Sequence, residues 1–208
     1  MDEKLESILQ GAGALFKKYG IRSISMDDIA RELGISKKTL YQVVDNKTDL
    51  VAYYLKSLVT KSDYSCLIGK TDEMNAIDIL LMVSQAVGRE IKEMNPVLAF
   101  DLQKYYPGIY REFVLSKRDH VYEQISRNFK QGIAEGLYRD DLGVELVSKL
   151  YVQKLIELHN PDFLSSVDFS FEKIFQTMFE NHIRGIANAT GLAYYENQIN
   201  KLNITQNP

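Results

Sequence analysis

Between positions 36 and 47 the sequence carries a dense set of side chains that can bind phosphate groups or the edges of bases. Lysine ammonium groups, hydroxyls and helix N-termini all favour phosphate oxygens. A glutamine can hydrogen-bond to N6 and N7 of adenine, and a threonine can touch a thymine methyl group or a phosphate. This set predicts recognition of double-stranded DNA. The residues of this set expected to face DNA are Ser36, Lys37, Lys38, Thr39, Tyr41, Gln42 and Lys47, and Ser25, which precedes the set, is expected to face DNA as well.

The same side chains also have a simpler interpretation. The three lysines could form a solvated face, and Tyr41 could pack on the rim of a core. That interpretation can hold for any single residue, but it accounts poorly for the whole set.

Two closely spaced helices are expected to position this set. Ser25 is a predicted N-cap for a helix over MDDIAREL, with Asp28 as its partner in a capping box, and Ser36 is a predicted N-cap for a helix over KKTLYQVV. Gly34 lies in the short connection, where glycine can adopt a positive φ. Two helices joined by three or four residues, with a glycine in the turn, are typical of a helix-turn-helix.

A preceding amphipathic helix, from about Asp2 to Tyr19, should supply the floor of this domain. Its apolar residues follow the i, i+3, i+4, i+7 rule, and Gly20 stands where a left-handed C-cap is expected. A fourth helix should begin near Lys47. The apolar residues of the first helix are Leu5, Ile8, Leu9, Ala12, Leu15 and Phe16.

Residues 8–50 resemble the N-terminal domain of the tetracycline-repressor (TetR) family. The resemblance rests on Ile8, Ala12, Leu15, Phe16, Gly20 and the stretch SISMDDIARELGISKKTLYQVVDNKTDL at 23–50. It implies a dimer, DNA binding by the third helix, and a C-terminal helical domain that often binds a small ligand. The chain departs from the family at Val43 and Val44, where the family usually has an aromatic residue or histidine and then phenylalanine. Val44 would keep a core contact, whereas Val43 lacks a side chain that commonly touches phosphate in the family.

Helical periodicity continues through the rest of the chain. Further helices are expected at about 73–94, 96–105, 108–135, 140–159 and 170–188, followed by a polar tail that should fray from Ala189. The predicted fold class is therefore all-α. A three-helix DNA-binding domain at 1–50 should precede a helical ligand-binding and dimerisation domain at 51–190 and a polar tail at 191–208.

Two groups of apolar side chains in the C-terminal half are candidates for ligand binding and dimerisation. The first group could line a flexible cavity that binds a ligand. The alternative is that these residues pack in the core, where aromatic residues at helical spacing are usually found. The predicted pocket residues are Met82, Phe100, Tyr105, Tyr106, Tyr110, Phe113 and Tyr122. The family resemblance implies that two helical stripes pair across a two-fold axis, with core closure as the alternative. The predicted interface residues are Leu146, Leu150, Ile174, Phe175, Met178, Phe179 and Ile183.

Composition narrows the classes of function. The net charge of −3 argues against a protein that coats nucleic acids indiscriminately, but it allows a specific binder. We find no catalytic signature and no metal-ligand spacing, so we expect no enzyme activity, no metal and no cofactor. No apolar run is long enough for a membrane span, no secretory signal is evident, and the single cysteine, Cys66, fits a reducing cytoplasm.

Together these observations predict a cytoplasmic transcriptional regulator that binds a palindromic operator as a homodimer. Release from DNA by a small-molecule effector, and repression rather than activation, follow from the resemblance alone. A competing hypothesis keeps the helix-turn-helix as a scaffold in a protein that does not bind DNA, and Val43 is the one feature that favours it.

Overall fold

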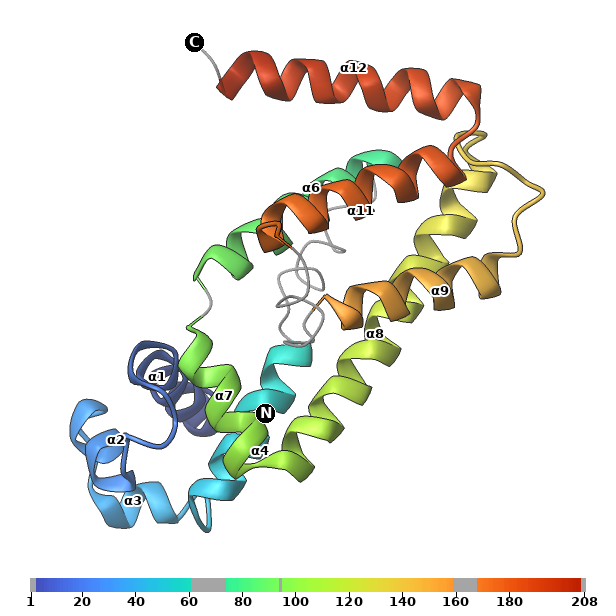
Figure 1. Cartoon of the computed structure of the whole chain (residues 1–208). Coiled ribbons are helices and arrows are strands. Elements are labelled where there is room, and N and C mark those ends of the chain that lie inside the picture. Colours follow the sequence, from blue (N-terminus) through green and yellow to red (C-terminus); the bar gives the residue numbers. More distant parts are fainter. Residues whose placement is uncertain (1–2, 61–73, 94, 159–167, 207–208) are drawn as a thin grey trace. The chain divides into compact units, whose positions relative to one another are not determined.

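The computed structural model describes residues 3–60, 74–93, 95–158 and 168–206, and helices account for most of them (Figure 1). The predicted all-α fold is confirmed, and the only β-type pairing among the described residues is an isolated bridge between Tyr138 and Ala187. The helices are α1 (Glu3–Tyr19), α2 (Met26–Glu32), α3 (Lys37–Tyr41), α4 (Lys47–Thr60), α6 (Ala76–Glu93), α7 (Pro96–Tyr105), α8 (Pro107–Ala134), α9 (Val144–Glu157), α11 (Phe171–Ile186) and α12 (Ala189–Gln206). None of the helices in this described part is long and apolar enough to cross a membrane.

Residue contacts divide the chain into two compact units. The first contains the described residues of 1–66 and 89–117, and the second contains those of 67–88 and 118–208. Each unit is therefore built from two separate stretches of sequence. This division differs from the predicted boundary after residue 50, and it assigns α7 and the beginning of α8 to the same unit as the helix-turn-helix.

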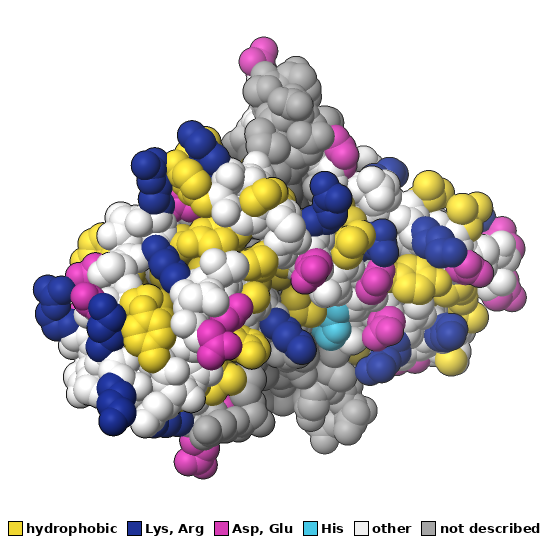
Figure 2. Space-filling model, turned by 90° about the horizontal axis from the view of Figure 1, so that it is seen from below, with side chains coloured by type: hydrophobic (Ala, Val, Ile, Leu, Met, Phe, Trp, Pro, Cys, Tyr) yellow, Lys and Arg dark blue, Asp and Glu magenta, His cyan; other side chains and the backbone are white. Residues whose placement is uncertain are grey.

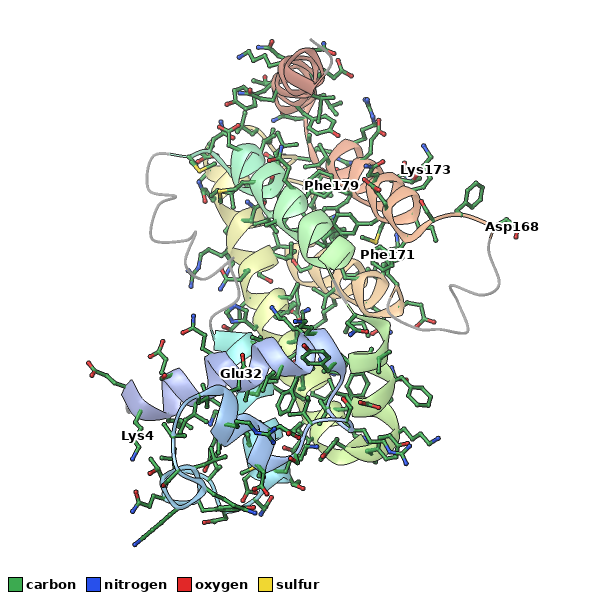
Figure 3. All side chains as sticks on the ribbon, turned by 90° about the vertical axis from the view of Figure 1, so that its left-hand side faces the viewer. Lys4, Glu32, Asp168, Phe171, Lys173 and Phe179 are labelled. Carbon is green, nitrogen blue, oxygen red and sulfur yellow. The ribbon has the colours of Figure 1, made fainter. Side chains whose placement is uncertain are left out.

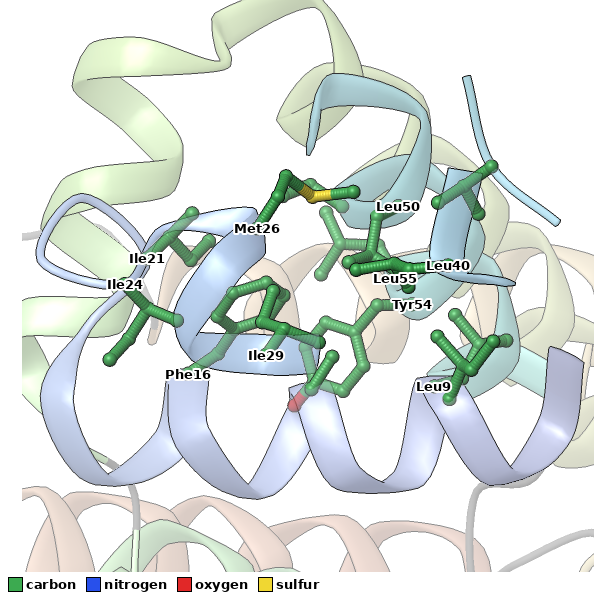
Figure 4. Packing of buried hydrophobic residues seen from close by; sticks show 14 of the residues in the cluster. Leu9, Phe16, Ile21, Ile24, Met26, Ile29, Leu40, Leu50, Tyr54 and Leu55 are labelled. Carbon is green, nitrogen blue, oxygen red and sulfur yellow. The ribbon is translucent and has the colours of Figure 1, made fainter. Parts of the chain in front are cut away.

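The core of the first unit extends beyond residue 50 because α4 is one continuous helix. Its residues Val51, Tyr54 and Leu55 are buried with the apolar side chains of α1, α2 and α3 (Figure 4). The ring of Tyr54 meets Phe16 edge to face, with 5.7 Å between the ring centroids. Leu102 of α7 completes the same core. The three N-terminal helices thus depend on α4 and α7 for part of their packing.

The C-terminal segment is a helix rather than the fraying polar tail that the sequence predicted. In α12 the ring of Tyr195 is buried in the second core, and the Tyr194 hydroxyl lies 2.7 Å from a carboxylate oxygen of Asp78 in α6. Asn188 begins the helix by accepting a hydrogen bond from the Gly191 amide. The polar composition hid a narrow apolar edge at helical spacing, formed by Leu192, Tyr195 and Ile199.

A buried polar chain runs through the core of the second unit. The Tyr138 hydroxyl lies 3.1 Å from the side-chain oxygen of Asn128, and the Asn128 amide donates to the carbonyl of Ala76 at 2.8 Å. Burial raises the pKa of the Tyr138 hydroxyl, which therefore stays protonated. Gly132 makes this arrangement possible, because a Cβ atom there would lie 2.2 Å from the Tyr138 ring.

Replacing Gly132 with alanine is expected to lower the free energy of unfolding by about 2 kcal/mol, because the Tyr138 ring must move out of its packed position. Urea unfolding measures this loss. Gly185 is a matched control, since it also lies within a helix but has no atom within 4 Å of the position that a Cβ atom would take. Gly185→Ala should leave stability unchanged or raise it by up to about 1 kcal/mol. Equal losses in the two variants would contradict the packing argument.

A half-buried imidazole packs against the second core. His182 of α11 stacks on the Tyr151 ring at 3.6 Å between centroids and meets Phe129 edge to face at 5.5 Å. Its Nε2 atom is buried and has no hydrogen-bond partner. Burial, with a smaller contribution from the Lys154 charge, lowers the pKa of His182 to about 4. The imidazole is therefore neutral near pH 7.

Candidate nucleic-acid interface

The start of α2 has the cap that the sequence predicted. The Ser25 hydroxyl accepts a hydrogen bond from the Asp28 amide at 3.1 Å, and the Asp28 carboxylate accepts one from the Ser25 amide at 2.9 Å. This capping box satisfies two amides that the helix itself leaves unpaired. Hydrogen bonds from the Ser25 hydroxyl and amide lower the pKa of the Asp28 carboxyl below its ordinary range. Ser25, predicted to face DNA, thus has its hydroxyl engaged in the cap.

A tight turn joins α2 to α3. Gly34 has a φ of +64°, and the Ile35 amide donates to the Ala30 carbonyl at 3.0 Å. Ser36 then caps α3 by accepting a hydrogen bond from the Thr39 amide at 3.0 Å, and the two hydroxyls lie 2.7 Å apart. The turn and both caps confirm the predicted helix-turn-helix.

α3 separates apolar from polar side chains. Leu40 is fully buried, and Val44, just beyond the helix, is buried as well. The side chains of Lys37, Lys38, Tyr41 and Gln42 are exposed, and Thr39 is half-buried. Tyr41 has 41% of its surface accessible, which is high for a large aromatic residue. α3 therefore presents cations, a phenol and an amide together on its outer side.

The two lysines of α3 have different surroundings. The Lys37 ammonium lies 2.7 Å from a carboxylate oxygen of Asp27 in α2, and this hydrogen bond raises the pKa of Lys37 above its ordinary value. No hydrogen bond or ion pair of the Lys38 side chain is found within the described ranges. Lys38 is thus the more available of the two cations.

Lys47 is placed differently from the prediction. Its ammonium donates to the Ile21 carbonyl at 2.6 Å, so one of its protons is used inside the protein. Burial lowers the pKa of Lys47, while the charges of Asp101 and Asp28 oppose this shift. Lys47 therefore ties the start of α4 to the turn between α1 and α2, a structural role that sequence spacing did not indicate.

α7 also supports this turn, through side chains that the sequence did not single out. The buried Asp101 carboxylate accepts a hydrogen bond from the Arg22 amide at 2.8 Å. Asn95, the N-cap of α7, donates to the Lys17 carbonyl at the end of α1 at 2.9 Å. The Asn-Pro pair at 95–96 is a recognisable N-cap signal, but the second bond of Asn95 joins residues 78 positions apart and has no sequence signature.

Val43 is half-buried and packs against the first core. Its apolar side chain offers no hydrogen bond to a phosphate, as its residue type led us to expect.

On the molecular face shown in Figure 2, lysine and arginine side chains alternate with aspartate and glutamate rather than forming a continuous basic surface. Binding to phosphates would then depend on local cations such as those of α3.

The predicted ligand-pocket residues do not come together within either unit. Phe100 and Tyr105 of α7 are exposed in the first unit. Three others pack against the core of that unit: Tyr106, Tyr110 and Phe113. Met82 and Tyr122 belong to the second unit and are half-buried there. Tyr106, Tyr110 and Phe113 therefore contribute to core packing, which was the alternative to a ligand pocket.

The two predicted dimerisation stripes divide into exposed and buried members. Phe175, Phe179 and Ile183 of α11 are buried within the second unit, so they close its own core. Figure 3 shows Phe179 and Lys173 on different sides of this helix. Leu146 and Leu150 of α9 remain 62% and 54% exposed. Ile174 and Met178 are half-buried.

An open hollow of about 660 Å³ lies along α9 and α11 in the second unit. Its lining is mainly apolar, with two lysines, and includes the half-buried members of the second stripe. The lining residues are Leu142, Val147, Leu150, Tyr151, Lys154, Phe169, Lys173, Ile174, Thr177, Met178, Asn181, His182, Gly185 and Ile186.

No group of His, Cys, Asp and Glu side chains suited to a metal ion is found in the described part of the chain. Cys66 lies outside the described residues.

Three solved structures share this fold over most of their length. A transcriptional regulator from Cytophaga hutchinsonii has a TM-score of 0.74 and 17% identity, over 90% of this chain and 100% of that one. A gamma-butyrolactone receptor, described as ArpA-like, has a TM-score of 0.61 and 18% identity, over 98% and 97%. The fatty acid degradation regulator FadR from Bacillus halodurans has a TM-score of 0.61 and 12% identity, over 88% and 95%. These similarities establish a shared fold.

No curated protein matches the sequence significantly. A family match covers the helix-turn-helix and the beginning of α4: residues 8–54 match the family described as "Bacterial regulatory proteins, tetR family". This range includes the capped helices, the Gly34 turn and the exposed side chains of α3. The part of the chain that is similar to this family therefore coincides with the helix-turn-helix and the first half of α4.

Proposed function

We propose that the protein is a sequence-specific DNA-binding transcriptional regulator, with α3 as its recognition helix. The observation that carries this proposal is the two-sided character of α3, which buries Leu40 and presents Lys37, Lys38, Tyr41 and Gln42 together. The lysines suit phosphate oxygens and Gln42 suits an adenine edge. Ser36 and Thr39 lie at the N-terminus of the helix, where further contacts with phosphate would form.

The proposal includes a homodimer on a palindromic operator. Leu146 and Leu150 offer an exposed apolar edge on α9, next to the hollow that Ile174 and Met178 line on α11. A second copy that packs its α9 and α11 there would bury these side chains. Two recognition helices related by a two-fold axis could then bind two half-sites of one operator.

A repressor released by a small molecule is the mode of action that we propose. The fold similarity to a gamma-butyrolactone receptor supports a small-molecule effector. Release would follow if the effector binds best to a dimer whose recognition helices no longer match the spacing of the half-sites.

Fluorescence anisotropy with labelled DNA from around the protein's own gene tests this function. Binding to one fragment by orders of magnitude more tightly than to random duplex, with a steep decrease as salt rises, is the expected result. Equal affinity for every fragment and for random DNA would favour the scaffold hypothesis instead. Sedimentation of the bound complex gives the number of copies on each operator.

Two single substitutions separate base reading from phosphate binding. Gln42→Ala should weaken operator binding by about 1–3 kcal/mol and relax the preference at one base position. Lys38→Ala should weaken binding to all sequences about equally, because Lys38 is the more available cation of α3. Binding by a panel of single-base operator variants distinguishes the two. If both variants bind like the parent, α3 is not the recognition helix.

A further inference from the structure

The ion pair between Asp27 and Lys37 links the two helices of the helix-turn-helix through their exposed sides. The ammonium–carboxylate distance is 2.7 Å, and the two side chains are 59% and 57% exposed. Lys37 is the first residue of α3, in the segment proposed to meet phosphate. The ion pair therefore occupies a cation that DNA would otherwise use.

The helix cap does not need this carboxylate. Asp28, not Asp27, forms the capping box with Ser25, and Asp28 also pairs with Arg31 at 2.8 Å. Asp27 makes no other hydrogen bond or ion pair with the described residues. Its one specific contact is with a lysine of the adjacent helix, whereas the neighbouring Lys38 has no such partner in the same described part of the chain.

We propose that Asp27 masks Lys37 and thereby lowers affinity for DNA of random sequence. This inference rests on the proposed function. Affinity for random DNA comes almost entirely from phosphates neutralised by lysine and arginine, each of which releases counterions. A lysine already neutralised by a carboxylate releases fewer of them.

The same ion pair is weak enough to open when α3 enters the correct site. Exposed ion pairs contribute little to stability, so contacts with the operator can displace the carboxylate at small cost. A regulator must find its operator among a large excess of competing DNA, and the ratio of the two affinities decides its occupancy. Because the operator must displace the carboxylate as well, Asp27 would limit the amount of protein held on competing DNA and would leave that ratio unchanged.

The direct test compares the parent with Asp27→Asn on a random-sequence duplex, by anisotropy at several salt concentrations. The variant should bind about 5-fold more tightly at low salt, and its plot of log affinity against log salt should be steeper by about 0.9. Asp119→Asn is the matched control, because Asp119 pairs with Arg118 at 2.7 Å on the surface of the second unit. That control should bind like the parent.

The same substitution made in a Lys37→Gln variant shows whether Asp27 acts through Lys37. With Lys37→Gln already present, adding Asp27→Asn should change random-DNA affinity little. An undiminished increase in that background, or an equal increase in Asp119→Asn, would overturn the masking mechanism.

Amine acetylation followed by mass spectrometry tests the pairing without DNA. Lys37 should react more slowly than Lys38 in the parent, and the two should react alike in Asp27→Asn. Equal labelling in the parent overturns the masking. If labelling differs as expected but the parent binds no duplex, the proposed function fails and the pairing has only a structural role.

Discussion

Replacing both Lys37 and Lys38 with glutamate is expected to lower affinity for every DNA duplex about 100-fold at about 0.1 M salt, because two phosphate-binding cations become repulsive. The fold should survive, since both side chains are exposed and acidic residues are favourable in the first turn of a helix. Anisotropy measures the affinity, and thermal unfolding of the same samples checks the fold.

Arg127 and Lys130 of α8 provide the matched control for this double reversal. Both belong to the second unit, and their replacement with glutamate changes the net charge by the same amount. That control should retain DNA affinity within a few-fold, because neither side chain belongs to the unit that contains α3. Equal losses in the two double variants would assign the effect to net charge and would argue against α3 as the contact surface.

Acidification is expected to destabilise the protein through His182. The folded state holds the pKa of this imidazole at about 4, below the ordinary value near 6.5, so protons bind more tightly to the unfolded chain. The stabilisation is therefore fully present above pH 6.5 and is lost as the pH falls towards 4. The loss amounts to about 1.4 kcal/mol per pH unit, or roughly 3 kcal/mol over the interval.

Urea unfolding between about pH 7.5 and 5 measures this loss, at pH values where most carboxylates are still ionised. His182→Phe is the informative variant, since it keeps a ring against Tyr151 and removes the titrating group. Its stability should depend much less on pH over this range. If the variant loses stability as steeply as the parent, another group is responsible.

Local signals made the helix-turn-helix predictable. The caps at Ser25 and Ser36 and the positive φ of Gly34 depend on residues within a few positions of one another. Each expresses a preference of the backbone that holds in most contexts. Gln42, which was expected to face DNA, is exposed at the end of this segment.

Contacts between distant residues were the part that the sequence could not predict. Lys47 looks like a surface cation in the sequence, and only the fold brings its ammonium to the Ile21 carbonyl. An apolar stripe on a helix indicates that this face packs against other side chains. It does not show whether those side chains belong to the same folded unit or to a second copy. Phe179 and Ile183 are covered by their own unit, whereas Leu146 is left exposed. The helix at 189–206 escaped prediction because one narrow apolar edge is enough when the rest of a folded unit packs against it.

The order in which the first unit is assembled follows from its two separate stretches of sequence. As the chain leaves the ribosome, the helix-turn-helix is complete long before Asp101 of α7 is available to hold the Arg22 amide. Until then the turn between α1 and α2 lacks that partner, and Leu102 is missing from the core. The helix-turn-helix would therefore reach its full stability only after the chain has been made through α7. An isolated N-terminal fragment should be less stable than the same residues in the whole protein.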